Sequence, residues 1–93
     1  MSYELLFHPD ALDEWGELDK ALREQFKKSL AERLLEPHVP ASRLSGHGQR
    51  YKIKLRSAGY RLVYEVRDAE LIVLVLAVGK RERNAVYQAA STR

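Results

Sequence analysis

The amino-acid sequence predicts an α+β domain in which an antiparallel four-stranded sheet, an N-terminal strand plus a three-strand meander, is covered by two N-terminal helices. A short C-terminal helix completes the fold. Two observations carry this prediction: residues 9–35 place apolar side chains at helical spacing, and residues 50–78 contain three extended segments separated by short turns. The 93 residues suffice for one hydrophobic core, so residues 1–93 form a single domain.

The first half of the chain begins with a short strand and a short helix. Residues 3–7 are aromatic and apolar, as is typical of a strand. Pro9 in the first turn and the early acidic residues favour a helix over residues 9–18. The apolar residues expected on one face of that helix are Leu12, Trp15 and Leu18.

A longer helix is expected over residues 20–35, with Asp19 as its cap. Its apolar stripe steps by four residues and consists of Leu22, Phe26, Leu30 and Leu34. Pro37 and Pro40 end it, because a proline disfavours the helical conformation of the residue before it.

The second half is a sheet followed by a helix. The expected elements are, in order, a loop over 37–48, strands over 50–56, 60–66 and 71–78 joined by turns at 57–59 and 68–70, and a helix over 82–90. Residues 50–56 alternate strictly between apolar and cationic side chains, which indicates a strand with one buried face. Residues 71–78 have no polar face, so this strand is expected to be covered on both sides.

Charge is distributed unevenly along the chain. Residues 1–36 hold nine acidic and five basic side chains, a sum of −4, whereas residues 37–93 hold four acidic and eleven basic ones, a sum of +7. A basic half of this kind attracts a polyanion, nucleic acid first, or an acidic protein partner. The absence of cysteine excludes disulfides and cysteine nucleophiles. With no signal peptide and no apolar run long enough to span a bilayer, we expect a cytoplasmic protein without membrane contact.

The strand register determines which cations share a face. Placing Leu55 opposite Leu62 gathers the apolar side chains under the helices, whereas a slip by one residue would mix them with lysines. In this register Arg56 lies opposite Arg61. One exposed face then collects Lys52, Lys54, Arg56 and Arg61 at about 6–7 Å spacing, similar to that of successive phosphates. A solvated lysine-rich face, or a device that blunts a sheet edge, is the alternative.

The C-terminal segment adds to the cationic set. Arg81 follows the last strand, and Arg83 and Tyr87 lie four residues apart on one face of the short helix. The histidines at positions 8, 38 and 47 have no metal-ligand spacing, so no metal site and no cofactor are expected. Composition and spacing alone therefore predict a small basic domain that binds an anion.

Two segments extend this prediction. Residues 51–64 (YKIKLRSAGYRLVY) and 78–87 (VGKRERNAVY) closely resemble the RelE toxins of bacterial toxin–antitoxin pairs, and the resemblance covers nearly the whole chain. It implies the RelE-like fold and a ribosome-dependent endoribonuclease, an mRNA interferase that cuts messenger RNA in the ribosomal A site. The implied reaction is attack of a 2′-hydroxyl on the adjacent phosphate, which leaves a 2′,3′-cyclic phosphate and inhibits translation.

The resemblance also implies site residues. The catalytic set is Lys52, Lys54, Arg61, Arg81 and Tyr87. Tyr87 is implied as the general base, which also stacks on the codon, and Arg81 as the general acid, while the other three hold the phosphate. Lys54, or a lysine–arginine pair, is the alternative acid, because a guanidinium is a poor proton donor. The residues expected to contact ribosomal RNA or message are Arg50, Arg56, Lys80 and Arg83.

The partners implied by the resemblance are a RelB-like antitoxin, the 70S ribosome with its ribosomal RNA, and messenger RNA. Operator DNA would be bound only through the antitoxin complex. Two alternatives remain open: a ParE-type toxin that binds DNA gyrase without nuclease chemistry, and a regulatory subunit that only joins its antitoxin on DNA.

Overall fold

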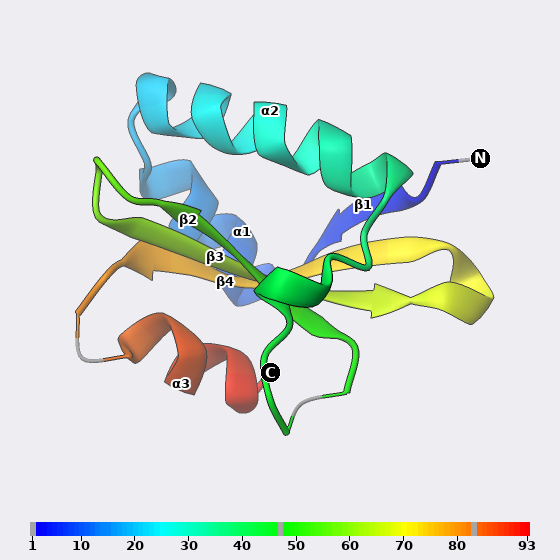
Figure 1. The fold of residues 1–93 in the computed structure, drawn as a ribbon. Helices are drawn as coiled ribbons and strands as arrows, with labels where there is room; N and C mark the ends of the chain where they lie inside the picture. Colours follow the sequence, from blue (N-terminus) through cyan, green and yellow to red (C-terminus); the bar gives the residue numbers. More distant parts are fainter. Residues whose placement is uncertain (1, 47, 83) are drawn as a thin grey trace.

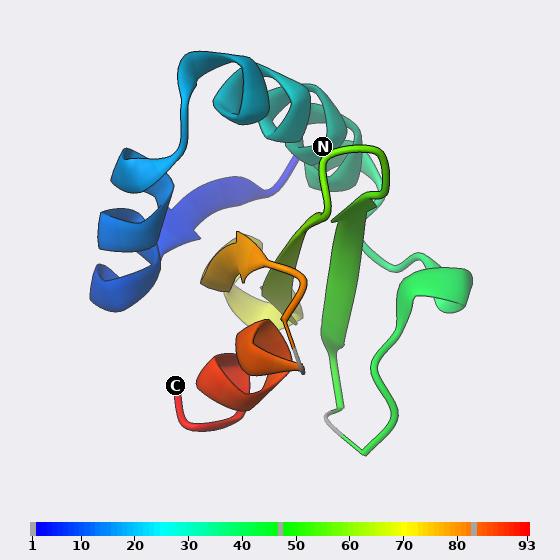
Figure 2. The ribbon, with the colours of Figure 1, turned by 90° about the vertical axis from the view of Figure 1, so that its left-hand side faces the viewer.

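A computed structural model of the chain describes residues 2–46, 48–82 and 84–93. Its elements are β1 (Glu4–Phe7), α1 (Pro9–Glu17), α2 (Lys20–Leu35), β2 (Arg50–Leu55), β3 (Tyr60–Arg67), β4 (Ile72–Lys80) and α3 (Ala85–Ser91), with 3-10 turns at Pro40–Ser42 and Asp68–Glu70. Figure 1 shows α2 on one side of the sheet and α3 on the other, and Figure 2 shows α1 beside the sheet at the β1–β4 side. The α+β fold, the three-strand meander and the expected helices are confirmed.

The sheet is mixed rather than purely antiparallel, which corrects the expectation for the first strand. The strand order is β1-β4-β3-β2, and β1 pairs parallel to β4. The reason is that α2 carries the chain back to the start of β1, where the Tyr3 backbone N–H donates to the Leu34 carbonyl at 2.8 Å. The meander therefore sets out in the same direction as β1, and its third strand runs parallel to β1.

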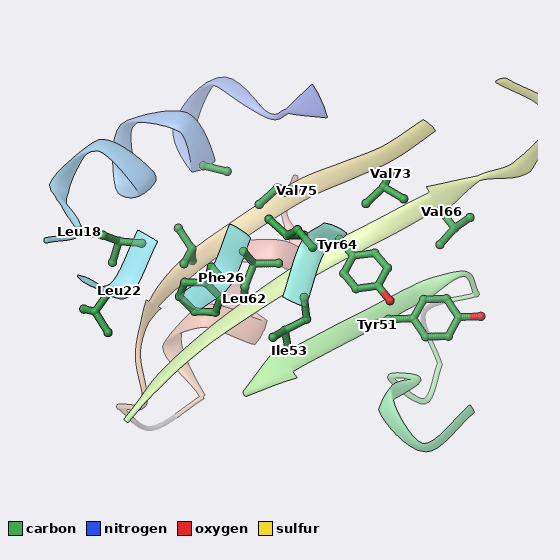
Figure 3. Packing of buried hydrophobic residues seen from close by; sticks show 13 residues of the cluster. Leu18, Leu22, Phe26, Tyr51, Ile53, Leu62, Tyr64, Val66, Val73 and Val75 are labelled. Atoms are coloured by element: carbon green, nitrogen blue, oxygen red, sulfur yellow. The ribbon is translucent and has the colours of Figure 1, made fainter. Parts of the chain in front are cut away.

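The core lies between α2 and the sheet (Figure 3). Phe26 and Leu30 of α2 are buried against Leu62 and Val75 of the sheet. On α1, however, Leu12 is 53% exposed and Ala11 is fully buried in its place. At 100° per residue, the stripe that meets the sheet begins at Ala11 and continues through Trp15, so the expectation for Leu12 was wrong.

The β2–β3 hairpin pairs two residues away from the expected register. Leu55 lies opposite Tyr60, not Leu62. The four connecting residues end at Gly59, whose φ is +69°. The expected register would have placed Tyr60 at that position, and a residue with a side chain disfavours a positive φ. Glycine therefore decides where the turn ends and, with it, the register of the hairpin.

A shift of two residues leaves every side chain on its own face. Lys52, Lys54 and Arg61 consequently still share one face, as the sequence predicts. The partners change: Lys54 lies directly opposite Arg61. Arg56, expected opposite Arg61, lies instead in the turn that follows β2.

The last strand is buried on both sides, as expected. Val73 and Val75 face the α2 side, and Leu76 and Ala77 face α3. The helix α3 begins at Ala85 rather than at residue 82, because Asn84 adopts a left-handed conformation with φ of 62°. No helix among the described residues is long and apolar enough to cross a membrane.

Candidate functional site

Strands β2 and β3 hold three cationic side chains on the face that carries α3. Lys54 and Arg61 are direct cross-strand partners, and Lys52 lies two residues from Lys54 on the same face. On β4, the strand on the other side of β3, Gly79 is the residue that pairs with Arg61. Since glycine has no side chain, α3 packs closely over this position, where a Cβ at Gly79 would lie 3.5 Å from Val86 Cγ2.

Tyr87 of α3 meets Arg61 on this face. Arg61 Nη1 donates a hydrogen bond of 3.0 Å to Tyr87 Oη, and the guanidinium carbon lies 5.5 Å from the centre of the tyrosine ring. Both a hydrogen bond and a cation–π contact therefore fix the phenol relative to the cationic strands. Val86 and Ala90, buried beneath α3, hold the helix to the sheet.

Arg81 reaches the same place from the end of β4. Its backbone N–H donates to the Gly59 carbonyl at 2.7 Å, which ties the segment after β4 to the β2–β3 turn. The two segments border a hollow of about 260 Å³. The residues that line it are Lys54, Leu55, Arg56, Gly59, Tyr60, Arg61 and Arg81.

Four of these lining residues are cations and none is a carboxylate or an imidazole. The hollow therefore suits a phosphate, and any acid–base chemistry in it has to come from lysine, arginine or tyrosine. Among the described residues, no group of three or more histidine, aspartate or glutamate side chains could hold a metal ion.

Neighbouring positive charges lower the pKa of the Lys54 side chain. The neighbouring charge of Lys52 is the largest cause that lowers the pKa of Lys54 below its ordinary value of 10.5. Partial burial and the charges of Arg61, Arg56 and Arg81 lower that pKa further. Lys54 thus gives up a proton more readily than an isolated lysine, whereas a guanidinium holds its proton throughout the accessible pH range.

A second hollow, of about 160 Å³, lies between α3 and the segment that leads into β2. Its lining residues are Leu44, Ser45, Arg50, Tyr87, Ala90 and Ser91. Tyr87 therefore contacts the cationic cluster through its hydroxyl group and borders a partly apolar hollow as well.

The residues expected to contact RNA lie in different parts of the structure. Arg56 lines the cationic hollow. Arg50 is only 18% exposed, because its Nη1 donates to the Ala90 carbonyl at 3.0 Å and its Nε lies 3.6 Å from Glu65 Oε1. Since Gly79 faces α3, the next residue, Lys80, turns to the opposite face of the sheet and borders a hollow near Glu14. Arg83 lies outside the described residues.

Sequence reasoning missed Gly59 as part of the site. Gly59 sets the hairpin register, and its carbonyl holds the backbone of Arg81. The available signal was its place at the end of a short connection between two strands, where a positive φ is often required. The five residues expected at the catalytic site are otherwise brought together around α3 and the β2–β3 turn.

Comparison with known proteins finds toxins, named ParE in a family model and RelE in full-length relatives. Residues 5–85 match the family model of the ParE toxin of the type II toxin–antitoxin system parDE. The chain is 52% identical over 93 residues to the mRNA interferase toxin RelE of Escherichia coli K12, covering all of this chain and 98% of that protein. The mRNA interferase RelE of Shigella flexneri is similar to the same extent, with 52% identity and the same coverage.

Solved structures agree with these matches. A variant of the E. coli toxin RelE in the free state superposes with a TM-score of 0.93 at 49% identity, covering 100% of this chain and 98% of that one. The toxin chain of the intact E. coli RelBE toxin–antitoxin complex gives a TM-score of 0.85 at 51% identity, over 88% of this chain and 100% of that one.

Proposed function

The chain belongs to the RelE/ParE superfamily of toxins from type II toxin–antitoxin systems, and we propose that it is an endoribonuclease that cuts messenger RNA in the ribosomal A site. The observation that carries this proposal is the contact between Arg61 and Tyr87, which joins the only phenol of α3 to a hollow lined by cations. Full-length identity of 52% to an mRNA interferase supports it.

The proposed reaction is a transfer of the phosphoryl group within the message. The 2′-oxygen forms a bond to the adjacent phosphorus, the bond from phosphorus to the 5′-oxygen breaks, and a 2′,3′-cyclic phosphate and a 5′-hydroxyl result. Tyr87 Oη takes the proton of the 2′-hydroxyl as the general base. The cations at positions 52, 54 and 61 stabilise the charge that builds up on the phosphate oxygens.

A proton also has to reach the departing 5′-oxygen. Arg81 borders the hollow, but its guanidinium is a weak acid. Lys54 borders the same hollow and has a lowered pKa. We therefore assign the general-acid role to Lys54 and a charge-stabilising role to Arg81.

The ribosome is proposed to supply what this site lacks. The hollow is open, and the described residues that line it include neither the carboxylate nor the imidazole that would make a strong acid–base pair. Holding the codon in a reactive geometry contributes rate independently of such groups, so free RNA is expected to be a poor substrate. The +7 charge of residues 37–93 favours docking on ribosomal RNA, with Arg56 as the contact next to the site. A protein with this activity would act in the cytoplasm, where messenger RNA is translated.

A RelB-like antitoxin is the proposed inhibitor. A toxin chain 51% identical to this one forms the E. coli RelBE complex. An acidic or amphipathic segment of the antitoxin would cover the basic surface, and the complex would bind operator DNA through the antitoxin.

A second function is favoured by one observation: the matching family model is described as a ParE toxin. A ParE-type toxin would bind DNA gyrase and would have no use for the cationic hollow beside Tyr87.

The experiment uses one 5′-labelled message, incubated with the purified protein alone and on ribosomes with an empty A site. Arg81→Ala and Tyr87→Ala are tested beside Lys28→Ala, which removes a cation from the exposed surface of α2. We expect a cut within the A-site codon only with ribosomes, slowed at least about 100-fold in the first two variants and retained in the third. Absence of any cut, with gyrase-dependent DNA breaks instead, would assign the protein to the ParE-type function.

A further inference from the structure

The edge of β4 beside β1 is only partly covered by a strand. β1 pairs with Ile72 to Val75, and the remainder of β4 extends beyond it. There the side chain of Glu14, from α1, takes the place of a strand: its Oε1 accepts a hydrogen bond from the Val78 backbone N–H at 3.2 Å. Arg93 also binds this edge of β4: its Nη1 donates a hydrogen bond of 2.8 Å to the Leu76 carbonyl.

These two side chains also bind each other. Arg93 Nη1 lies 2.7 Å from Glu14 Oε1, and Nη2 lies 3.1 Å from Oε2, so the ion pair is bidentate. Only 14% of the Arg93 side chain is exposed. A bidentate pair with little solvent access fixes geometry better than an exposed pair of surface charges.

The ion pair acts on α3, because Arg93 lies two residues after Ser91, the last residue of that helix. The Arg93 backbone N–H donates to the Ala90 carbonyl at 3.1 Å, so the position of the arginine is transmitted to the last turn of the helix. With seven residues, α3 is too short to be stable alone, and its position depends on tertiary contacts. Tyr87 lies one turn before Ala90, and its hydroxyl meets Arg61.

We propose that Glu14 and Arg93 are positioning residues of the cleavage site: their ion pair clamps α3 to the open edge of β4 and so holds the Tyr87 hydroxyl at Arg61. Neither residue lines the cationic hollow. This inference rests on the proposed endoribonuclease function and extends it to two residues outside the cationic hollow, one on α1 and one after α3.

Loss of the clamp should affect catalysis more than binding. Arg93→Ala removes the groups that bind Glu14, Asp10 and the Leu76 carbonyl. Among the described residues, α3 is then held by its apolar contacts, by Arg50 at the Ala90 carbonyl and by the Arg61–Tyr87 hydrogen bond. A displacement of about 1 Å can cost about 100-fold in rate. The cations that dock on RNA are unchanged, so kcat should fall at least about tenfold while KM for the programmed ribosome stays within about twofold.

The test measures cleavage on ribosomes by wild-type protein, Arg93→Ala, Glu14→Gln and Arg93→Lys, with Lys28→Ala as a control that removes one charge on the other side of the sheet. Lysine keeps the charge but not the bidentate geometry, so Arg93→Lys should recover part of the rate. Arg93→Ala is also combined with Tyr87→Ala. If Arg93 acts through Tyr87, it should lower kcat by less than about twofold in that background. Equal losses in both backgrounds would overturn the proposal in favour of general destabilisation.

A second measurement does not depend on activity. Amide hydrogen exchange of residues 86–90 and the NMR shifts of the Tyr87 ring are compared in wild-type protein and Arg93→Ala. We expect faster exchange in α3 and altered ring shifts, with the amides of β3 unchanged. Unaltered α3 exchange and ring shifts would overturn the clamp whether or not the protein cuts RNA. A wild-type protein that shows the clamp but never cuts would instead contradict the proposed function.

Discussion

Arg61 on β3 and Tyr87 on α3 are joined by a 3.0 Å hydrogen bond from a guanidinium nitrogen to the phenol oxygen. The bond connects the cationic strands to a helix on the same face of the sheet, and it leaves the hydroxyl beside the hollow that suits a phosphate. The consequences of this arrangement can be tested one side chain at a time.

Tyr87→Phe removes the hydroxyl group and keeps the aromatic ring, so it tests the roles of the two groups separately. If the hydroxyl is the base, this change should reduce A-site cleavage by at least about 100-fold, nearly as much as Tyr87→Ala, because general base catalysis contributes about 100- to 10,000-fold. Single-turnover cleavage on ribosomes measures it, with Tyr3→Phe as a control in which a remote tyrosine loses its hydroxyl. Wild-type rates in Tyr87→Phe would show that the ring alone is required.

Lys54→Ala should move stability and activity in opposite directions. Lys54 lies directly opposite Arg61, and like charges at paired positions of a sheet destabilise it. Removal of the lysine should therefore raise the urea midpoint of unfolding, while cleavage falls at least about 100-fold. Lys28→Ala is the matched control, and it should leave both quantities near wild type. A lower urea midpoint in Lys54→Ala would contradict the repulsion.

The pH dependence of cleavage should reflect Lys54. A lysine that donates a proton must be charged, so the contribution of Lys54 to the rate is lost as pH rises through its pKa. Because Lys52 is the main cause that lowers the pKa of Lys54, this contribution should be lost at lower pH than for an ordinary lysine, and Lys52→Ala should move the loss to higher pH. NMR titration of the Lys54 side chain checks the shift without activity. An identical pKa in both proteins would refute this origin.

Asp68 links three parts of the chain at the far end of the sheet. Its Oδ1 accepts from Tyr3 Oη at 2.6 Å and lies 2.7 Å from His38 Nε2. The hydrogen bond from Tyr3 is the first cause, and that from His38 the second, that lowers the pKa of Asp68 below its ordinary value of 3.8.

A lowered carboxyl pKa stabilises the fold above the unfolded-state pKa, and this contribution is lost as pH falls through the folded-state value. Asp68→Asn should therefore lower the urea midpoint at pH 7 and reduce its decline between about pH 5 and pH 2. Glu70→Gln, which neutralises a nearby exposed acid in the same turn, serves as the control. An unchanged pH profile in Asp68→Asn would rule out this contribution.

Phe26 tests the core. Its side chain is fully buried between α2 and the sheet, with the Trp15 ring centre 6.1 Å away. Phe26→Ala should cost about 3–5 kcal/mol of unfolding free energy, a large share of the about 5–15 kcal/mol typical of a domain. Urea unfolding followed by Trp15 fluorescence measures the loss. Leu35→Ala, at a side chain that is 66% exposed, should change stability little.

Much of the fold follows from local pattern. The four-residue steps of α2, the alternation of β2 and the continuous apolar run of β4 each reflect a period that burial of one or two faces imposes. The same periodicity placed Lys52, Lys54 and Arg61 on one face, and an error of two residues in the register did not alter that result.

The remaining features depend on residues far apart in the sequence. The parallel direction of β1 follows from the return of α2 to Tyr3, and the engagement of Arg50 with Ala90 follows from the seat of α3 on the sheet. The position of Tyr87 at Arg61 also depends on contacts between distant residues, which include the ion pair between Glu14 of α1 and Arg93 after α3. Periodicity in the sequence thus determined which side chains share a face, because burial acts on each element separately. Only the tertiary structure decided which of them meet, because those contacts depend on how whole elements pack.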